Sequence, residues 1–295
     1  MRPENKLPGR IQVFGHRGAS GYRPENTLEA FKLAFEMGAD AIECDLLPTK
    51  DGDLIIRHDN YLSTTTDVAT RPEFAHLKRE GLVGWQDYRE DWFCEDFTLA
   101  EIKQLRAIER VPEERPGSAK FDGQFEIPTL DELLAADFVS SKHLILEVKH
   151  GAYFATQGFP VSAILARKLR ESNWKHRGVT LTLESFDFKV LEQMQRVCGD
   201  VGEYVFLVDT WGEPRFDETA KIFDGISFNY RLTMNSDWIQ QAKARGLKVF
   251  IWTAKAEEAE ASIEEYYSKF ILSGADGVFA DQPDLLVEVA KGLEH

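Results

Sequence analysis

The sequence predicts an α/β fold, a closed TIM (β/α)8 barrel with a small insertion after the second barrel strand. Eight short apolar runs alternate with longer segments of helical periodicity, and eight β/α units favour a closed parallel barrel over an open sheet. The length of 295 residues suits one such barrel with an insertion. We therefore expect one domain over residues 1–295, with residues 60–120 as an insertion packed over one barrel mouth.

The expected strands share short length and β-branched or aromatic composition. They cover residues 11–15, 41–47, 144–148, 179–183, 204–208, 226–229, 248–252 and 277–280. The expected helices cover residues 27–37, 130–138, 161–171, 188–197, 236–244, 256–270 and 285–291, with a weaker candidate at 216–222. Helix signals support several of them: Pro160 suits a first helical position, Asp187 an N-cap and Gly246 a helix stop.

The insertion interrupts this alternation. Residues 54–57 are expected to form a small extra strand that leads into it, and about sixty residues follow without a clear β/α unit, which is too long for an ordinary connection. Its aromatic residues Trp85, Trp92 and Phe97 are expected to form a small core of its own.

Composition excludes several classes of protein. The net charge of −15 argues against general binding to nucleic acid or to an anionic membrane surface. No apolar run reaches the length of about 18 residues that a membrane span needs, so we expect no stable membrane insertion. Residues 1–5 lack the apolar centre of a signal peptide. We therefore expect a cytoplasmic protein, with a periplasmic or secreted location as the alternative if a leader is removed.

Histidines and carboxylates cluster where the first expected strands end. His16 ends strand one, Glu43 and Asp45 lie late in strand two, and His58 follows soon after. Residues two apart on a strand project to one face, so Glu43 and Asp45 repel each other unless a cation lies between them. Carboxylate oxygens suit Mg²⁺ or Ca²⁺, and two histidines can give and take protons near neutral pH. The pattern predicts a metal site with an acid and a base beside it.

The end of the third expected strand adds Glu147 and Lys149, again two residues apart, and Trp252 ends the seventh strand. Catalytic groups of this fold lie at the carboxyl ends of strands. A third acid among so few basic residues favours a metal over structural ion pairs.

At this point the chain resembles the glycerophosphodiester phosphodiesterase family, from about residue 11 to residue 287. A lone His-Arg-Gly would be a weak signal, but an ordered series of motifs is highly specific. The matching motifs are His16-Arg17-Gly18, Pro24-Glu25-Asn26-Thr27, Glu43-Cys44-Asp45, His58-Asp59, Ile127-Pro128-Thr129-Leu130, Leu146-Glu147-Val148-Lys149, Ser185-Phe186, Trp252-Thr253 and Ala275-Asp276-Gly277-Val278.

The resemblance implies a barrel hydrolase that cleaves small-molecule glycerophosphodiesters to glycerol 3-phosphate and an alcohol with one divalent cation. By the same resemblance, His16 and His58 form the acid/base pair, and Glu43, Asp45 and Glu147 hold the metal. Arg17 and Lys149 touch the phosphate, and Trp252 lines the glycerol side. Two positions depart from the family pattern: Ala254 stands where Asn is common, and Glu184 where Gln often precedes the Ser-Phe pair.

Each substrate contact has a structural alternative. Arg17 either binds a phosphate through its planar guanidinium group or forms a structural ion pair. Lys149 either binds the phosphate or neutralises Glu147. Trp252 is a pocket wall or a core residue. Glu25 touches the substrate or the strand-one histidine, or else caps the first helix.

Two alternative functions remain at this stage. The same barrel could act on a lysophospholipid-type phosphodiester, or it could be a non-catalytic module that binds glycerol phosphates. The two histidines favour the enzyme, because binding alone needs no acid/base pair. The nucleophile is either water or the neighbouring glycerol hydroxyl, and the sequence leaves open which histidine acts as the acid.

Overall fold

The computed structural model describes residues 10–83, 87–209 and 212–293. Eight parallel strands form the barrel, and β1 pairs with both β2 and β11, which closes the sheet. The eight predicted strands are thus confirmed. They are β1 (Gln12–Gly15), β2 (Ala41–Pro48), β6 (His143–Val148), β7 (Thr180–Ser185), β8 (Glu203–Val208), β9 (Gly225–Asn229), β10 (Lys248–Ala254) and β11 (Gly277–Ala280).

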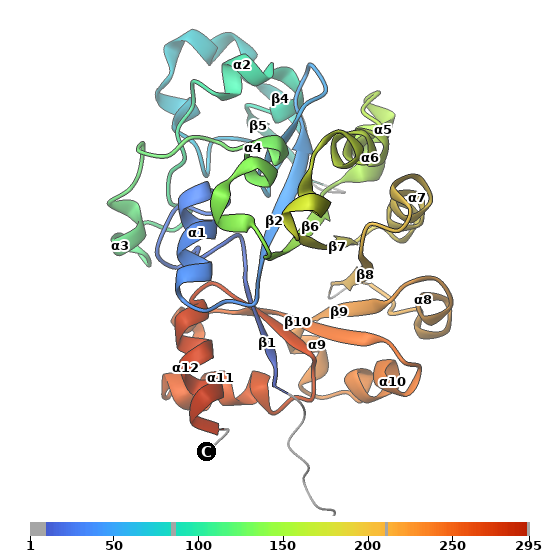
Figure 1. The fold of residues 1–295 in the computed structure, drawn as a ribbon. Helices are drawn as coiled ribbons and strands as arrows, with labels where there is room; N and C mark the ends of the chain where they lie inside the picture. The colour runs from blue at the N-terminus through green and yellow to red at the C-terminus, as the bar shows by residue number, and fades with distance from the viewer. Residues whose placement is uncertain (1–9, 84–86, 210–211, 294–295) are drawn as a thin grey trace, which may run out of the picture.

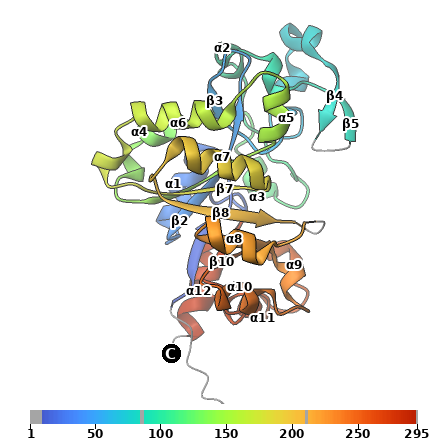
Figure 2. The same ribbon diagram turned by 90° about the vertical axis from the view of Figure 1, so that its right-hand side faces the viewer.

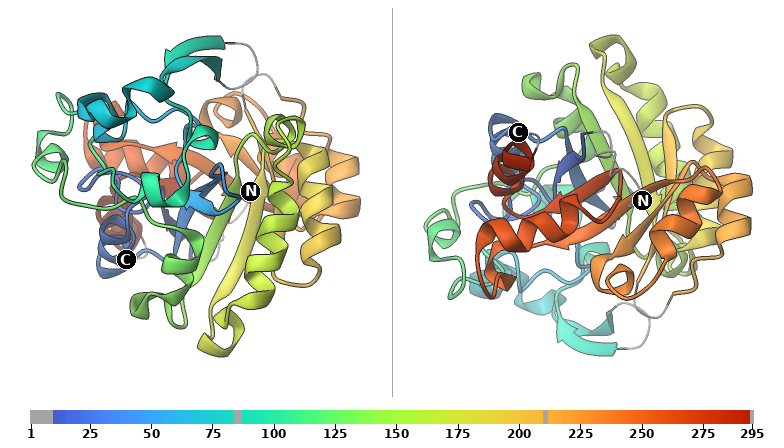
Figure 3. Two further views of the ribbon diagram at one scale, coloured as in Figure 1. Left: turned by 90° about the horizontal axis from the view of Figure 1, so that it is seen from above. Right: turned by 90° about the horizontal axis from the view of Figure 1, so that it is seen from below.

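Helices surround the barrel on its outside (Figure 1, Figure 3). The main ones are α1 (Leu28–Glu36), α4 (Leu130–Ala135), α6 (Val161–Glu171), α7 (Phe188–Cys198), α8 (Phe216–Ile222), α10 (Trp238–Ala244), α11 (Ile263–Ile271) and α12 (Pro283–Leu293). Outside the insertion, the described chain has two short helices that were not predicted, α5 (Gly151–Thr156) and α9 (Tyr230–Thr233).

Two predicted helices are wrong in extent. The helix predicted over 256–270 is a 3₁₀ turn (Ala256–Glu258) and a separate α11, because Ser262 accepts a hydrogen bond from the Glu265 backbone N–H and so starts a new helix. The helix predicted over 130–138 ends at Ala135, because Ala136 has an extended backbone.

Side chains alternate along the barrel strands between the interior and the helical layer. On β2, Ala41 belongs to the apolar cluster inside the barrel, whereas Ile42, Cys44 and Leu46 belong to the larger core between strands and helices. Because this alternation has a period of two, the next inward positions after Ala41 are Glu43 and Asp45. The same argument places Glu147 inward after Ile145 on β6. The interior is therefore apolar at its base and acidic near the carboxyl ends of the strands.

Three phenylalanines fill the base of the barrel. The Phe14 ring centroid lies 5.0 Å from those of Phe250 and Phe279, in edge-on contacts that aromatic quadrupoles favour. Gly277 makes room for them, since a Cβ there would lie 2.4 Å from the Phe14 ring. A packed base leaves the upper end of the barrel for a ligand.

The insertion follows a short strand, β3 (Leu54–Ile56), that runs antiparallel to β2. Its elements α2, β4 and β5 lie in the upper part of Figure 1 and Figure 2, on the side toward which β2 extends, whereas α3 lies lower, near α1 in Figure 1. Its elements are three 3₁₀ turns (Asp67–Thr70, Pro72–Leu77 and Cys94–Asp96), β4 (Arg79–Val83), β5 (Asp87–Asp91), α2 (Leu99–Ile102) and α3 (Pro116–Ala119).

As far as its described residues show, the insertion does not have a separate core. Trp92 and Phe97 are buried, but they belong to the same apolar cluster as the outer barrel layer, because β2 and β3 carry that cluster up into the insertion. The third residue predicted for such a core, Trp85, lies outside the described residues. Within the ranges that the structure describes, no helix has both the length and the apolar character needed to cross a bilayer.

Candidate active site

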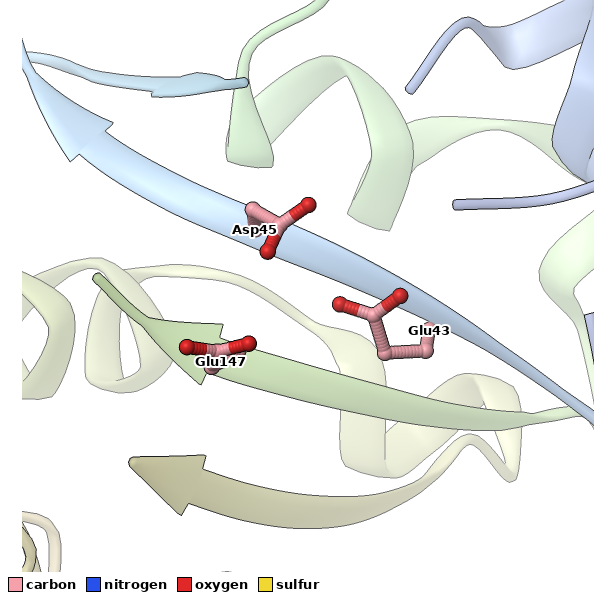
Figure 4. Close-up of side chains that lie close together, drawn as sticks. All are labelled: Glu43, Asp45 and Glu147. Atoms are coloured by element: carbon pink, nitrogen blue, oxygen red, sulfur yellow. The ribbon is translucent and has the colours of Figure 1, made fainter. Parts of the chain in front are cut away.

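Three carboxylates gather near the carboxyl ends of two neighbouring strands (Figure 4). Glu43 and Asp45 extend from β2 and Glu147 from β6, where Asp45 stands opposite Glu147 in the strand register. One oxygen from each residue lies within 4.8 Å of the other two, and all three residues are buried. The structure thus brings together the three acids that the sequence singled out for a metal.

Two neighbours from the loop after β1 orient this carboxylate cluster. The Asn26 amide nitrogen donates a hydrogen bond to Asp45 Oδ2 at 2.8 Å, and the Arg17 backbone N–H donates to Glu43 Oε2 at 2.9 Å. The second oxygen of Glu43, Oε1, is buried and has no hydrogen-bond partner among the described residues. An unpaired buried carboxylate oxygen is costly, and it leaves an acceptor that a cation can use.

The three acids influence one another's ionisation. Burial, together with the charges of Asp45 and Glu147, raises the pKa of Glu43 well above its usual range. Burial also raises the pKa of Glu147 to about 7, against the opposing effect of Lys149. Burial acts in the same direction on Asp45, but the positive charges of Arg17 and Lys149 and the Asn26 hydrogen bond hold its pKa at about 2. The cluster is short of positive charge, as expected for a site that binds a cation.

A fourth acid lies beside this cluster. Glu184 stands opposite Glu147 on β7 and is 2% exposed. Its Oε2 has no hydrogen-bond partner in the described part of the chain. Burial and the charges of Glu147 and Asp45 raise the pKa of Glu184 well above its usual range. This is the position where the family that the sequence resembles often has Gln, and a protonated carboxyl group offers a donor there as an amide would.

The two predicted histidines lie at the same mouth of the barrel and share one local geometry. His16 Nδ1 lies 2.6 Å from Asp281 Oδ1, and His58 Nδ1 lies 2.6 Å from Asp59 Oδ1. With the proton on Nδ1 donated to the carboxylate, Nε2 is left to accept or deliver a proton. Asp281 directly follows β11, and Asp59 directly follows His58. Each ring is thus held in one orientation by an acid.

Burial and nearby cations favour the neutral form of both histidines. Burial, with the charges of Arg17 and Lys149, lowers the pKa of His58 to about 3. Burial and Arg17 also lower the pKa of His16, although Asp281 opposes them. Each carboxylate partner shows the converse effect: the histidine hydrogen bond holds the pKa of Asp59 and of Asp281 below its usual range, against the effect of burial.

Two arginines of the insertion bind the far oxygens of these two aspartates. Arg115 Nη2 donates to Asp281 Oδ2 at 2.5 Å. Arg110 Nη1 forms an ion pair with Asp59 Oδ2 at 2.7 Å that lacks the alignment of a hydrogen bond. The insertion therefore reaches the barrel mouth through residues 110–115.

A hollow of about 170 Å³ opens above the carboxylates. Its lining includes His16, His58, Glu43, Glu147, Lys149 and Trp252. Trp252 meets Phe186 edge-on, with ring centroids 5.4 Å apart, and its indole Nε1 is buried without a hydrogen-bond partner among the described residues. The hollow therefore combines an acidic floor, two histidines and an aromatic wall.

The two predicted phosphate contacts are engaged with acids in this structure. Lys149 Nζ lies 2.9 Å from Glu147 Oε1 and 3.7 Å from Asp45 Oδ1. Arg17 Nη1 donates to Glu25 Oε1 at 3.1 Å, and its Nε lies 3.5 Å from Asp45 Oδ2. Both cations therefore adjoin the carboxylate cluster and form part of the wall of the same hollow.

Glu25 has a different setting from the other predicted residues. Arg17 and Arg110 both donate to its carboxylate, and Arg110 does so with two nitrogens, at 2.8 and 2.9 Å. The alternative in which Glu25 caps the first helix is wrong, because Thr27 is the N-cap and accepts from the Ala30 N–H. Glu25 faces a side hollow of about 200 Å³ that also contains His16, Arg110 and Arg115.

The glycine of the His-Arg-Gly motif has a steric role. Gly18 has φ +82°, and a Cβ there would lie 2.5 Å from the Ala30 backbone. Only glycine fits this turn. The turn places Arg17 between the carboxylate cluster and Glu25.

A larger hollow than these two lies elsewhere. About 520 Å³ opens between α9, α10 and α11, lined by residues such as Met234, Ile239 and Phe270. Its lining contains neither of the two histidines nor any of the three clustered acids. Size alone therefore does not identify the chemical site here.

Several site residues were not assigned a role from sequence. Asn26 and Asp59 lay within quoted motifs, and Asp281 follows the last predicted strand, so strand-end position could have drawn attention to them. Arg110 and Arg115 carry no local signal, because their partners are far away in sequence: 85 residues separate Arg110 from Glu25, and 166 separate Arg115 from Asp281.

Comparison with known proteins gives consistent results. The sequence model of the glycerophosphoryl diester phosphodiesterase family matches residues 16–285. A glycerophosphodiester phosphodiesterase from Caldanaerobacter subterraneus is 28% identical and covers 95% of this chain and 97% of its own length. One from Bacillus subtilis is also 28% identical, with 97% of this chain and 88% of its own length covered.

A solved structure shares the fold. A phosphodiesterase from Oleispira antarctica, in complex with the product sn-glycerol-3-phosphate, superposes with a TM-score of 0.72. It is 24% identical, and the alignment covers 95% of this chain and 96% of that one.

Proposed function

The chain belongs to the glycerophosphoryl diester phosphodiesterase family, and we propose that it hydrolyses glycerophosphodiesters to glycerol 3-phosphate and an alcohol. In this proposal one divalent cation is held by Glu43, Asp45 and Glu147, and His16 and His58 are the acid/base pair. The observation that carries the proposal is the meeting of that carboxylate cluster with two histidines whose Nδ1 atoms are each fixed by an aspartate.

The carboxylate cluster suits a hard cation such as Mg²⁺ or Ca²⁺. Its donor atoms are oxygens, and the buried Glu43 Oε1 has no other partner in the described chain. When bound there, a divalent cation would supply charge neutralisation at the phosphoryl oxygens of the substrate. Glu43, Asp45 and Glu147 would hold it.

Arg17 and Lys149 would bind the phosphodiester anion. Anionic oxygens repel an attacking nucleophile, so positive groups that meet the charge as it develops lower the barrier. The Arg17 guanidinium can offer two parallel donors, and Glu25 orients it from the other side at 3.1 Å. Lys149 brings a point charge above the ring of Phe186, with Nζ 5.1 Å from the ring centroid.

The two histidines would transfer protons in opposite directions while the nucleophile attacks the phosphorus. One accepts the proton of the nucleophile, either a water or the neighbouring glycerol hydroxyl, and the other protonates the leaving alkoxide. Both pKa values are lowered in this structure, so both rings favour the neutral form that a base requires. The substrate anion adds negative charge at the mouth and thereby favours the protonated form that the acid requires.

The glycerol half would lie against Trp252. The indole ring of Trp252 suits a small polyol, because its flat face offers an apolar surface and its buried Nε1–H, which has no partner among the described residues, offers a hydrogen-bond donor. We place the glycerol phosphate deep in the 170 Å³ hollow and the alcohol toward the insertion.

A coupled assay for glycerol 3-phosphate release from glycerophosphocholine tests the proposal. We expect turnover with Mg²⁺ or Ca²⁺ and its loss after exhaustive chelation, with restoration when the cation returns. Full activity in protein shown to be metal-free would contradict the cation. A lysophospholipid cleaved in preference to glycerophosphocholine would favour that alternative substrate, and binding of glycerol 3-phosphate without any turnover would favour a binding module.

A further inference from the structure

Each of the two histidines is connected to an arginine of the insertion through one aspartate. Asp281 and Asp59 each place one carboxylate oxygen on a histidine Nδ1 and the other on an arginine of the insertion. We propose that Arg110 and Arg115 are positioning residues, which fix the two histidines in catalytic orientation through Asp59 and Asp281. The inference rests on the proposed function, because it assigns the histidines to the acid/base steps.

Arg115 holds the His16 side of the site. Its Nη2 donates to Asp281 Oδ2 at 2.5 Å, its Nε to Glu257 Oε1 at 2.7 Å and its Nη1 to the Ser20 carbonyl at 3.1 Å. These partners come from the loops after β11, β10 and β1. The guanidinium thus joins three loops, and only a planar group with several donors can do this.

Arg110 holds the His58 side. Its Nη1 lies 2.7 Å from Asp59 Oδ2, while Nε and Nη2 donate to the two oxygens of Glu25. Glu25 in turn accepts from Arg17. One guanidinium therefore links the orienting acid of a histidine to the residue proposed to bind phosphate.

The second contact on each aspartate has a physical consequence. A carboxylate held only by a histidine can rotate about its Cβ–Cγ bond and carry the ring with it. An arginine on the other oxygen prevents this rotation, and a small misplacement of a catalytic group costs much of its rate. The side chains of both aspartates are largely buried, at 4% and 11% exposure for Asp281 and Asp59, so water cannot readily replace these contacts.

The positive charge of each arginine also acts on its histidine. Removing it leaves the aspartate uncompensated, which favours the protonated imidazole. The other charged groups around the two rings are unchanged by such a substitution. They are Arg17, Asp45 and Asp281 at His16, and Arg17, Lys149, Asp45, Asp59 and Glu25 at His58.

This reasoning predicts a distinctive pH profile. The histidine that acts as base sets the acidic limb of the kcat profile, and the one that acts as acid sets the alkaline limb. Arg115→Gln and Arg110→Gln should therefore move different limbs, each toward higher pH, by about half a unit to one unit. The prediction does not depend on which histidine is the acid.

The experiment measures kcat, KM and pH profiles on glycerophosphocholine for Arg110→Gln, Arg115→Gln and their Lys variants. We expect each Gln variant to lose about 10-fold to 100-fold in kcat with KM little changed, and each Lys variant to recover part of the loss. In the double variant Asp281→Asn with Arg115→Gln, the loss should not exceed that of Asp281→Asn alone, because the arginine acts through the aspartate.

Arg79→Gln is the matched control. Arg79 also lies in the insertion and pairs with Asp96 and Glu95 at 2.6 and 3.3 Å, away from both histidines. The Arg79→Gln substitution should leave kcat and both limbs of the pH profile unchanged. Thermal unfolding shows whether each variant is folded, and a Gln variant that fails to fold is replaced by its Lys variant.

Two results would overturn the inference. One is wild-type kcat and unmoved limbs in folded Arg110 and Arg115 variants. The other is a raised KM at unchanged kcat, which would mean that the arginines act on substrate binding, directly or through Glu25 and Arg17, and not on the orientation of the histidines. Failure of the proposed function looks different: wild-type protein would release no glycerol 3-phosphate, or His16→Ala and His58→Ala would keep their turnover.

Discussion

His16 and His58 follow different strands, yet each meets an acid at Nδ1 over the same distance of 2.6 Å. An imidazole held in this way keeps Nε2 available to accept a proton or to deliver one. The pair is therefore symmetric in its local contacts, and its two roles must be separated by the charges farther out. The charge of Lys149 is one such difference, because it helps to lower the pKa of His58.

Replacing either histidine tests its role in proton transfer. We expect His16→Ala and His58→Ala each to lower kcat by at least about 10²-fold, the usual scale for one general acid or base. Both should keep near-wild-type melting temperatures, because both side chains lie at the mouth and not in the apolar core. Steady-state kinetics on glycerophosphocholine and thermal unfolding check this, and turnover close to wild type in either variant would remove that histidine from the mechanism.

The carboxylate cluster should make the stabilising effect of a cation depend on pH. In the cation-free protein the pKa of Glu147 is raised from 4.5 to about 7, so folding stability falls as pH rises through this window, because the unfolded chain ionises first. A cation that binds the ionised carboxylates would restore that stability. The rise in melting temperature on adding Mg²⁺ or Ca²⁺ should therefore be larger at about pH 8 than at about pH 5.

Glu147→Gln is the control for this effect. It keeps the size of the side chain but removes one ionisable ligand, so it should reduce both the cation-dependent shift and its pH dependence. Equal shifts at the two pH values in the wild-type protein would show that the cation does not bind these acids.

At the scale of elements, strand alternation explains most of what the sequence could predict. Inward and outward positions follow from a period of two, so the strand ends alone place Glu43, Asp45 and Glu147 on one face. The eight strands are bounded by clear turns and were found within a few residues of their ends. Helix ends were harder to predict, because local caps such as Ser262 compete with a longer helical pattern.

The contacts that the sequence could not predict are between elements far apart in the chain. His16 and Asp281 are separated by 265 residues, and their contact follows from barrel closure by β1 and β11. Arg110 and Arg115 lie in irregular segments, where no periodicity fixes the direction of a side chain. Their partners could be identified only once the insertion had been placed against the barrel.

The packed base of the barrel predicts a sensitive position on β11. In Gly277→Ala the new methyl group would lie 2.4 Å from the Phe14 ring and 3.1 Å from Phe250, and neither buried ring has room to move. We expect a loss of about 1–3 kcal/mol in the free energy of unfolding, measured by denaturant titration. Gly292→Ala, where no atom lies within 4 Å, is the control, and equal stability of the two variants would contradict the tight base.

At the scale of the whole molecule, the barrel and the insertion contribute different residues to the candidate active site. The barrel supplies the carboxylate cluster and the aromatic wall from its strands. The insertion supplies two guanidiniums through residues 110–115, and these also face the side hollow of about 200 Å³ beside His16. Loop variation at the carboxyl ends of barrel strands sets substrate choice while the chemistry stays fixed. We therefore expect the alcohol to be the part of the substrate that the insertion contacts.

This division predicts strict recognition of glycerol and loose recognition of the alcohol. With the glycerol phosphate deep beside Trp252 and the cations, the alcohol would point outward toward the insertion, where solvent and polar groups tolerate different shapes. Glycerophosphocholine, glycerophosphoethanolamine and glycerophosphoglycerol should then all be cleaved, and kcat/KM for the three measures the tolerance. Bis(p-nitrophenyl) phosphate, which lacks glycerol, should be a poorer substrate. Values of kcat/KM that differ by more than about 10³-fold among the three, about 4 kcal/mol in barrier, would show that the alcohol is recognised specifically. Preference for the glycerol-free diester would overturn the placement of glycerol against Trp252.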